Sequence, residues 1–529
     1  MPTYNSDIKY LEQAINSCVQ QEYGCWELCI CDDGSTDKSV TDKIREWCAK
    51  DARIRAVFAE KNEGVGAASN HALKICDGEY VGFLDDDDIL DKSCLMEVVR
   101  VLMQNPDAKV VYSDETIIDT VTNRMIRVIR KPDFSPDRLL NTNYINHFTV
   151  VEKKVLDECG GFDPTLSGAQ DHDILLKISE KTDKFYHIPK FLYFLRQDSN
   201  YVAGKNMAKS RAFEAGLRAV RNALERRGLQ GTVKLDKKSF LYRVKYILAK
   251  QPKVSIIIPF KDKPSLLKRC LESIFKRTSY RNIEIVLVDN KSTSPTLLRY
   301  LKSQMSDSRM RVIQYNKPFN YATINNDAAR VAGGEYLLFL NNDTEVISPH
   351  WIEEMLGICQ QRHVGVVGAK LLFPTKKVQH AGVSMVKVRD ILQFYNISDD
   401  PDNGDEIVKN CIAVTGACMM VKRETFEKVG GFDEKLGVFF NDTDFCLSAR
   451  EKGYFVAYTP YAKLIHYEGS SRGAAEDRLM KENSGYISLK WGDKLSEDTY
   501  HNPPKQLFWG DWAAYLKGKP VRKPSSHVT

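Results

Sequence analysis

The sequence predicts an α/β protein made of two tandem copies of one domain. Landmarks of the first copy return in the same order in the second, roughly 256 to 270 residues later: 27–36 as 284–293, 78–80 as 334–336, and 160–163 as 430–433. Apolar runs of strand length alternate with stretches of helical spacing. This alternation is typical of a parallel sheet covered by helices on both faces.

The second copy shows the alternation most clearly. Residues 254–259 form a continuous apolar run, which predicts a buried strand, and residues 265–276 carry apolar side chains at helical spacing. A further apolar run at 283–288 predicts the next strand. Ligands of such sheets bind beyond the carboxyl ends of the strands, so the polar residues that follow each strand are the candidate site.

The first copy lacks a counterpart of the first of these strands. No residues precede Met1 to match 254–257 of the second copy. We expect this domain to be without its initial strand, either because the start is truncated relative to the native gene or because the domain is structurally impaired. The intact polar loops downstream favour truncation.

The domain boundaries follow from composition. We place the first domain at 1–228, a connector at 229–252, the second domain at 253–500 and a basic, Pro-containing tail at 501–529. Residues 205–227 predict an amphipathic helix with a basic side, which fits domain packing better than an anionic membrane surface because its apolar side is mostly Ala. Alternating apolar residues between 240 and 246 predict an extended connector.

Composition excludes several classes of protein. The chain has 529 residues and a net charge of only +6, without the concentrated basic face of a nucleic-acid binder. Thirteen Cys without a CxxC pair, Cys25, Cys29 and Cys31 included, indicate reduced thiols rather than a metal site. The sequence has no apolar run long enough to span a membrane and no leader, so we expect a cytoplasmic protein, with peripheral contact at the inner face of the membrane left open.

Each copy has an oxygen-rich turn where a strand ends. Residues 335–340 run into Asn341, Asn342 and Asp343, and residues 79–84 run into four consecutive aspartates that include Asp85 and Asp87. Mg²⁺ and Mn²⁺ prefer oxygen ligands, and Mg²⁺ is commonly held by one or two carboxylates together with substrate phosphates. The alternative is a solvated acidic turn, or a cap for the helix that follows.

A second polar feature follows a glycine pair in each copy. Asp171 and Asp442 stand at the start of a predicted helix, after 160–163 and 430–433 respectively. A carboxylate there serves either as a helix cap or as a general base that takes a proton from an acceptor hydroxyl.

Taken together, these motifs resemble those of family 2 glycosyltransferases, which are inverting enzymes with the GT-A fold that build bacterial surface polysaccharides such as O-antigens or rhamnans. The resemblance rests on PTYN, DDGSTD and FLDDDD in one half and on IIIPFKD, FLNNDT, TGACMMVKRE, GGFDE, NDTDFCL and IHYEGSSRG in the other. It covers nearly the whole chain and implies two tandem GT-A domains. Each motif is weak when taken alone.

The resemblance also implies roles for individual residues. It places the catalytic bases at Asp171 and Asp442, and the metal and diphosphate contacts at Asp85, Asp87, Asp343 and His466. It places the nucleotide and donor contacts at Asp32, Asp33, Asp289, Asn290, Pro259, Asn341, Asn342 and Gly416. His466 taken alone would be read as a buried structural histidine.

The two copies depart from each other. The first has no histidine where His466 stands in the second and offers Gln197 or Asp198 instead. The second has amides at Asn341 and Asn342 where the first has carboxylates. We therefore expect two sites with different donors or acceptors.

From these features we expect Mg²⁺- or Mn²⁺-dependent, inverting transfer of sugars from UDP- or dTDP-sugars to hydroxyls of a growing glycan or lipid-linked glycan. One alternative is that only the second domain is catalytic and the first is a glycan-binding or docking module. A less favoured alternative is a sugar nucleotidyltransferase, for which the loop at 259–262 lacks the expected glycines. The segment 379–382 carries His380, to which spacing assigns no role.

Overall fold

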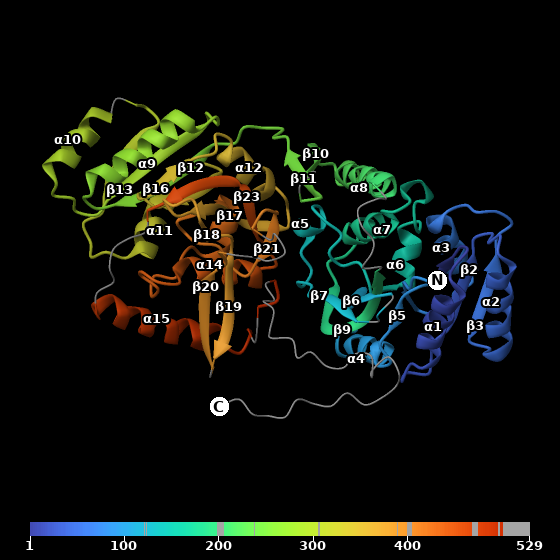
Figure 1. The fold of residues 1–529 in the computed structure, drawn as a ribbon. Coiled ribbons are helices and arrows are strands. Elements are labelled where there is room, and N and C mark those ends of the chain that lie inside the picture. The colour runs from blue at the N-terminus through green and yellow to red at the C-terminus, as the bar shows by residue number, and fades with distance from the viewer. Residues whose placement is uncertain are drawn as a thin grey trace.

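The computed structural model describes residues 1–120, 122, 124–197, 206–236, 239–304, 307–388, 390–398, 405–467, 474–495 and 498–500, without the side chains of 206–210 and 474–477. The chain forms two α/β halves that lie side by side (Figure 1). A two-stranded antiparallel hairpin, β10 (Gly231–Asp236) and β11 (Leu241–Tyr246), connects them. The tail at 501–529 and Asp198 lie outside the described residues.

The second half contains one continuous ten-stranded sheet. Eight of its strands follow the order β14-β13-β12-β15-β22-β17-β23-β16, and the other two, β18 and β21, pair with β17 and β23 respectively. Its first four strands are parallel, as predicted, whereas β22 runs antiparallel to both β15 and β17. The prediction of a wholly parallel sheet is therefore wrong for its far side. The sheet is mixed there because the chain returns through β17 and β22 after the first βα units.

The elements of the second half have these bounds: β12 (Val254–Phe260), α9 (Pro264–Arg277), β13 (Ile283–Asp289), α10 (Pro295–Gln304), β14 (Met310–Gln314), α11 (Tyr321–Val331), β15 (Tyr336–Leu340), β16 (Thr344–Val346), α12 (Trp351–Cys359), β17 (Val364–Leu372), β18 (Val378–His380), β19 (Val383–Val388), β20 (Ile391–Asn396), β21 (Lys409–Cys411), β22 (Cys418–Lys422), α13 (Arg423–Val429), α14 (Asn441–Glu451), β23 (Phe455–His466) and α15 (Ala474–Trp491). The predicted strands and helix at its start are confirmed to within one or two residues.

The first half repeats this order, with its sheet in two parts. β1 has only two residues and pairs with β2 alone, so that β1, β2 and β3 form one sheet and β4, β8, β6, β9 and β5 form another. In the second half, β12 pairs with β13 on one side and β15 on the other. The prediction that the initial strand is missing is thus wrong for its last two residues, which form β1, and the sheet is interrupted between β2 and β4.

The elements of the first half have these bounds: β1 (Pro2–Thr3), α1 (Ile8–Val19), β2 (Leu28–Asp32), α2 (Lys38–Lys50), β3 (Ile54–Phe58), α3 (Val65–Lys74), β4 (Tyr80–Gly82), β5 (Ile89–Leu90), α4 (Cys94–Gln104), β6 (Val110–Asp119), β7 (Met125–Ile129), α5 (Pro136–Leu139), β8 (Thr149–Glu152), α6 (Lys153–Glu158), a 3-10 turn η1 (Pro164–Leu166), α7 (Gln170–Ser179), β9 (Phe185–Gln197) and α8 (Asn206–Arg226).

The amphipathic helix α8 packs inside the first half. Its Ala215, Val220 and Leu224 are buried in the core that also holds Val233 of the hairpin strand β10. Arg226 pairs with Glu180 at 2.8 Å. The structure thus confirms a domain-packing helix, and within the described residues no helix is both long and apolar enough to cross a membrane.

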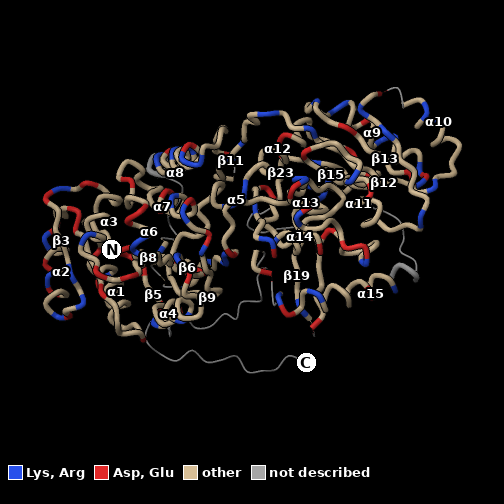
Figure 2. The backbone as a smooth tube through the Cα atoms, turned by 180° about the vertical axis from the view of Figure 1, so that it is seen from behind, with Lys and Arg blue, Asp and Glu red and all other residues tan. Residues whose placement is uncertain are grey.

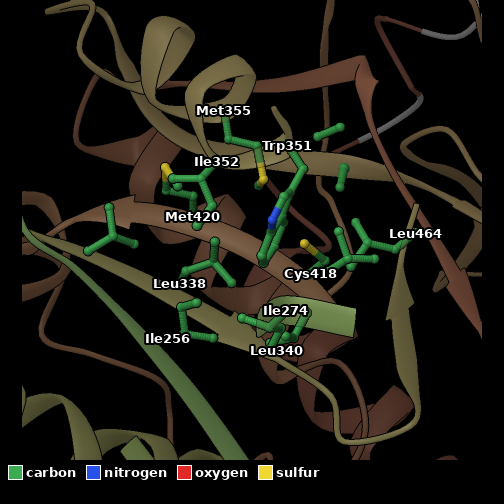
Figure 3. Packing of buried hydrophobic residues seen from close by; sticks show 14 of the residues in the cluster. Ile256, Ile274, Leu338, Leu340, Trp351, Ile352, Met355, Cys418, Met420 and Leu464 are labelled. Atoms are coloured by element: carbon green, nitrogen blue, oxygen red, sulfur yellow. The ribbon is translucent and has the colours of Figure 1, made fainter. Parts of the chain in front are cut away.

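Trp351 is the largest fully buried side chain of the second half. It is fully buried, packs with Leu338 and Cys418 from two strands of the sheet, and donates from Nε1 to Thr278 Oγ1 at 3.0 Å (Figure 3). The indole is thus both an apolar filler and a satisfied donor. This core holds α12 against the strands whose ends form the site.

A small polar network joins the two halves. Asn410 of β21 accepts from Ser135 Oγ at 2.8 Å and donates to Asp137 Oδ2 at 2.7 Å, and all three residues are buried. Elsewhere Lys and Arg mix with Asp and Glu over both halves (Figure 2). The surface therefore shows the near-balanced charge that the sequence predicts.

Candidate active site

A cavity of about 800 Å³ opens beyond the carboxyl ends of the central strands of the second half. Eight of the predicted residues line it: Pro259, Asn290, Asn341, Asn342, Asp343, Gly416, Asp442 and His466. They come from segments up to 207 residues apart in sequence. The fold therefore brings the candidate donor, metal and base residues to one place, as the positions of the strand ends predict.

The strand-end loop after β13 is held by carboxylates. Asp289 Oδ1 accepts from Ser292 N at 2.9 Å, and its Oδ2 accepts from Gln314 Nε2 at 3.2 Å. Asp262 clamps the facing loop by accepting from the amides of Thr293 and Ser294, both at 2.8 Å. Asp289 thus shapes the loop that presents Asn290 to the cavity.

His466 stands beside the oxygen-rich turn. Its Nε2 lies 3.2 Å from Asp343 Oδ1 and 3.5 Å from Asn341 Nδ2. Burial would raise the pKa of Asp343, but the hydrogen bond and charge of His466 outweigh it and lower that pKa. The imidazole nitrogen and the carboxylate oxygen, two types of metal ligand, therefore lie side by side at the turn.

Gln379 holds the other side of the same imidazole. Its Oε1 lies 2.9 Å from His466 Nδ1, and both side chains are almost fully buried. Because an amide oxygen only accepts, Nδ1 carries a proton in either charge state of His466. In the charged ring Nε2 also carries a proton and faces Asp343 with it, and in the neutral ring the Nε2 lone pair faces Asp343. Sequence reasoning gave the segment 379–382 no role, because only tertiary structure places it against His466.

Asp442 occupies the first turn of α14 on the other side of the cavity. Its Oδ2 accepts from Gly416 N at 2.7 Å and its Oδ1 accepts from Thr443 N at 2.8 Å. Tyr321 donates to Gly416 O at 3.1 Å, and its pKa is raised by burial and by the charge of Asp442. Gly416 thus holds the carboxylate through its backbone.

Sequence reasoning missed several residues that line the same cavity. Aromatic side chains form much of its wall, and Lys263 at the start of α9 adds a positive charge that acts on Asp343. Isolated aromatics and lysines carry no sequence signal of their own. The aromatic residues of the wall are Phe260, Phe319, Tyr321, Phe394, Tyr395, Phe439 and Phe440.

The site of the first half is smaller, with a cavity of about 110 Å³ that Asp85 and Asp171 line. In its loop, Asp33 accepts from the amides of Glu63 at 2.9 Å and Gly64 at 2.8 Å, so both of its oxygens hold the backbone. Asp32 Oδ1, in contrast, is buried and has no hydrogen-bond partner among the described residues. Of this predicted pair, only Asp32 has a carboxylate oxygen without a hydrogen-bond partner among the described residues.

Four carboxylates crowd the acidic turn of the first half. Asp88 is buried and accepts from Tyr193 Oη at 2.7 Å and from Arg196 N at 2.8 Å. Burial and the charges of Asp85 and Asp87 raise the pKa of Asp88 to about 7. Such crowding of like charges is the environment that a divalent cation relieves.

Asp171 begins α7 at the position that Asp442 occupies in α14. Its Oδ2 accepts from Gln170 Nε2 at 2.9 Å. Burial raises the pKa of Asp171 to about 6, although the charge of His147 opposes this shift. A carboxylate with a pKa near 6 is well placed to act as a general base near neutral pH.

The strand register corrects the expectation for the missing histidine of the first copy. In the second half Glu345 pairs with Ile465, the residue before His466. In the first half Ile89, the counterpart of Glu345, pairs with Phe194. Leu195 therefore stands where His466 does, and Gln197 lies two residues beyond.

The donor set fits a divalent cation that is shared with a diphosphate. Within the described ranges no group of three or more His, Cys, Asp and Glu side chains could hold a metal ion by itself. The first turn combines several carboxylates with a nearby imidazole, and the second combines one carboxylate with an imidazole. Mg²⁺ sites of one or two carboxylates are completed by substrate phosphates. Asp343 with His466, and Asp85 with Asp87, are the residues that would hold it.

Two α/β domains, each with a polar site at the carboxyl ends of its strands, are the architecture that the sequence predicts for a tandem glycosyltransferase. The model of the family named Glycosyl transferase family 2 matches residues 1–160 and 255–430. The chain belongs to this family, and the prediction of a family 2 glycosyltransferase with two tandem GT-A domains is confirmed.

Similar proteins are known from bacteria. The chain is 38% identical to the uncharacterized protein y4gI of Sinorhizobium fredii over 97% of its own length and 58% of that protein. It is 37% identical to the O-antigen biosynthesis protein RfbC of Myxococcus xanthus over 95% of its length and 40% of that protein. It thus spans only about half the length of these two relatives. Among solved structures, GalNAc-T7 with UDP, GalNAc and Mn²⁺ gives a TM-score of 0.41 at 16% identity, over 50% of this chain and 52% of that one.

Proposed function

We propose that this protein transfers sugars from nucleotide-diphosphate sugars to hydroxyls of a growing cell-surface glycan, with inversion at the anomeric carbon and with a divalent cation, Mg²⁺ or Mn²⁺. One observation supports this most: Asp442, a carboxylate held from both sides by backbone amides, lines the same cavity as the Asp343 and His466 pair. A general base and a cation site in one cavity suit a single displacement at the anomeric carbon, which inverts its configuration.

The residues of the second site divide the chemistry between them. Asp442 accepts the proton of the acceptor hydroxyl while the oxygen of that hydroxyl forms a bond to the anomeric carbon, whose bond to the diphosphate breaks. The amide of Gly416 keeps the carboxylate oriented, which is part of the positioning that transfer requires. When bound by Asp343 and His466, the cation supplies Lewis-acid stabilisation of the departing diphosphate.

The donors we propose are UDP- or dTDP-sugars, with Asp32, Asp289, Asn290 and Pro259 near the nucleotide. The acceptor we propose is a glycan or lipid-linked glycan at the cytoplasmic face of the cell membrane, because one relative is named for O-antigen biosynthesis. The aromatic wall of the larger cavity supports a sugar acceptor, since aromatic faces pack well against the apolar face of a pyranose ring.

The first domain offers a second candidate function. Its smaller cavity and its interrupted sheet favour a glycan-binding or docking module, whereas Asp171 with a raised pKa favours a second active site. We propose that both sites transfer sugars, with different specificities that follow from the different turns.

Single substitutions of the two bases test the proposal. Nucleotide sugars are screened by released nucleoside diphosphate, with Asp171→Asn, Asp442→Asn and the unaltered chain side by side. We expect each variant to lose one transfer, by at least about 100-fold, while nucleotide binding persists. Full turnover in Asp442→Asn would exclude it as the base. An Asp171→Asn chain that forms every linkage would make the first domain a binding module.

A further inference from the structure

His147 is the histidine that the structure places in the first site. It precedes β8 and lies beside the acidic turn, with Nε2 at 3.4 Å from Asp85 Oδ2. By the pairing of β4 with β8 and of β15 with β22, His147 takes the place that Ala417 has in the second half. Ala417 lines the cavity of the second site, and His147 contacts Asp85, which lines the cavity of the first.

The surroundings of His147 hold it in place from its ring face and its backbone. Its ring stacks on Tyr193, with centroids 4.9 Å apart and planes inclined by 15°. The buried Lys131 donates to the carbonyls of Ile145, at 2.5 Å, and of His147 itself, and pairs with Glu115 at 3.1 Å. The hydrogen bonds of Lys131 thus fix the backbone of His147, and stacking on Tyr193 fixes the plane of its imidazole beside the turn.

The hydrogen bonding of His147 differs from that of the structural histidines of this chain. His172 Nε2 bonds to Leu139 O at 2.7 Å, and His187 pairs with Asp114 at 2.8 Å. His380 Nδ1 lies 2.8 Å from Asn396 Oδ1. His147 is only 7% exposed, yet its Nδ1 has no hydrogen-bond partner among the described residues. Within the described residues, the close polar contact of the His147 ring is therefore the one that its Nε2 makes with Asp85.

The distance to Asp85 matches that of two ligands of one ion. Neighbouring ligands of an octahedral cation, each at about 2.1 Å, lie about 3 Å apart. The Nε2 to oxygen distance is 3.4 Å for His147 and Asp85 and 3.2 Å for His466 and Asp343. The two sites thus offer the same pair of donor atoms, although their histidines come from different strands.

We propose that His147 is the nitrogen ligand of the divalent cation in the first site and binds it together with Asp85 and the donor diphosphate. The inference rests on the proposed function and adds to it a ligand that lies outside the family pattern at this position, since Leu195 occupies the place of His466. The first copy has moved its imidazole from the end of β9 to the start of β8. The two sites therefore present their imidazoles from different strands, which fits different donors.

Pulsed EPR of Mn²⁺ tests this, because it detects coupling of the ion to a coordinated ¹⁵N nucleus. The full chain is labelled with ¹⁵N-histidine, loaded with Mn²⁺ and UDP, and compared with His466→Ala, His147→Ala and the double variant. We expect about half of the nitrogen-coupled Mn²⁺ to remain in each single variant and none in the double variant. In the His466→Ala chain, adding His147→Ala should weaken first-site Mn²⁺ affinity at least about tenfold.

The His466→Ala chain leaves the first domain untouched, so its result does not depend on the folding of a His147 variant. If that chain binds Mn²⁺ but shows no ¹⁵N coupling, His147 is not a ligand and the inference fails while the proposed function stands. If the unaltered chain binds no Mn²⁺ in the presence of UDP, the proposed function itself is refuted. His71→Ala, at a half-buried histidine of α3, serves as the control and should keep all of the coupling.

Discussion

Gln379 should control the metal affinity of the second site although it lies behind His466. Replacing it with Leu removes the acceptor at 2.9 Å from His466 Nδ1. The imidazole then either leaves a buried N–H unpaired or moves its proton to Nε2, where it faces Asp343 and blocks the lone pair that would bind the cation. Both outcomes disfavour the metal-bound state.

The structure sets the size of this effect. Gln379 is 5% exposed and His466 is 8% exposed, so water does not readily replace the lost acceptor. Loss of such an outer partner typically lowers metal affinity by about 10- to 100-fold, which is about 1.4 to 2.7 kcal/mol. We expect Gln379→Glu to keep most of the affinity, because its carboxylate still offers an acceptor oxygen.

Titration with Mn²⁺ in the presence of UDP measures this affinity directly. The chain also offers a matched control, since Gln393 of β20 is exposed and Gln393→Leu should change nothing. Equal Mn²⁺ affinity in Gln379→Leu and the unaltered chain would refute the assignment of Gln379 as the residue that orients His466.

Three further predictions concern other parts of the chain. In an Asp442→Asn background, transfer by the first domain should fall as pH drops through about 6, because burial raises the pKa of Asp171 to about 6 and only the ionised form is a base; a flat rate between pH 5 and 8 would contradict this. Gly416→Val should slow transfer at least about tenfold, since a Cβ there already meets Tyr321 Oη at 3.2 Å, whereas Gly485→Ala, with open space, should not. Trp351→Ala should cost about 3 to 5 kcal/mol of unfolding free energy, measured by urea denaturation.

The second site could be predicted from sequence largely because its donors follow strands. A continuous apolar strand must end where polar residues begin, and the carboxyl ends of parallel strands meet at one edge. This places Asn290 and Asp343 in one cavity without any knowledge of the packing. The duplication made Asp442 a candidate as well, because a glycine pair precedes both the helix of Asp442 and the helix of Asp171.

Residues reached through long-range packing could not be predicted in this way. The sequence predicts Gln197 or Asp198 in place of His466 in the first copy, but a match by sequence spacing does not fix strand register. The pairing of β5 with β9 puts Leu195 at the position of His466. His147 precedes β8, which pairs with β4, the strand that leads to the acidic turn. No spacing rule in the sequence connects His147 to Asp85.

The sequence by itself therefore determined the duplication, the alternation of strands and helices and the acidic turns, since each follows from local residue patterns. Only the tertiary structure decided how the sheet of the first half divides, which imidazole stands beside each turn and which residue orients it. These depend on strand register and on contacts such as that of Gln379 with His466, 87 residues apart in the chain. Such contacts form only when the strands of the sheet have paired in their final register.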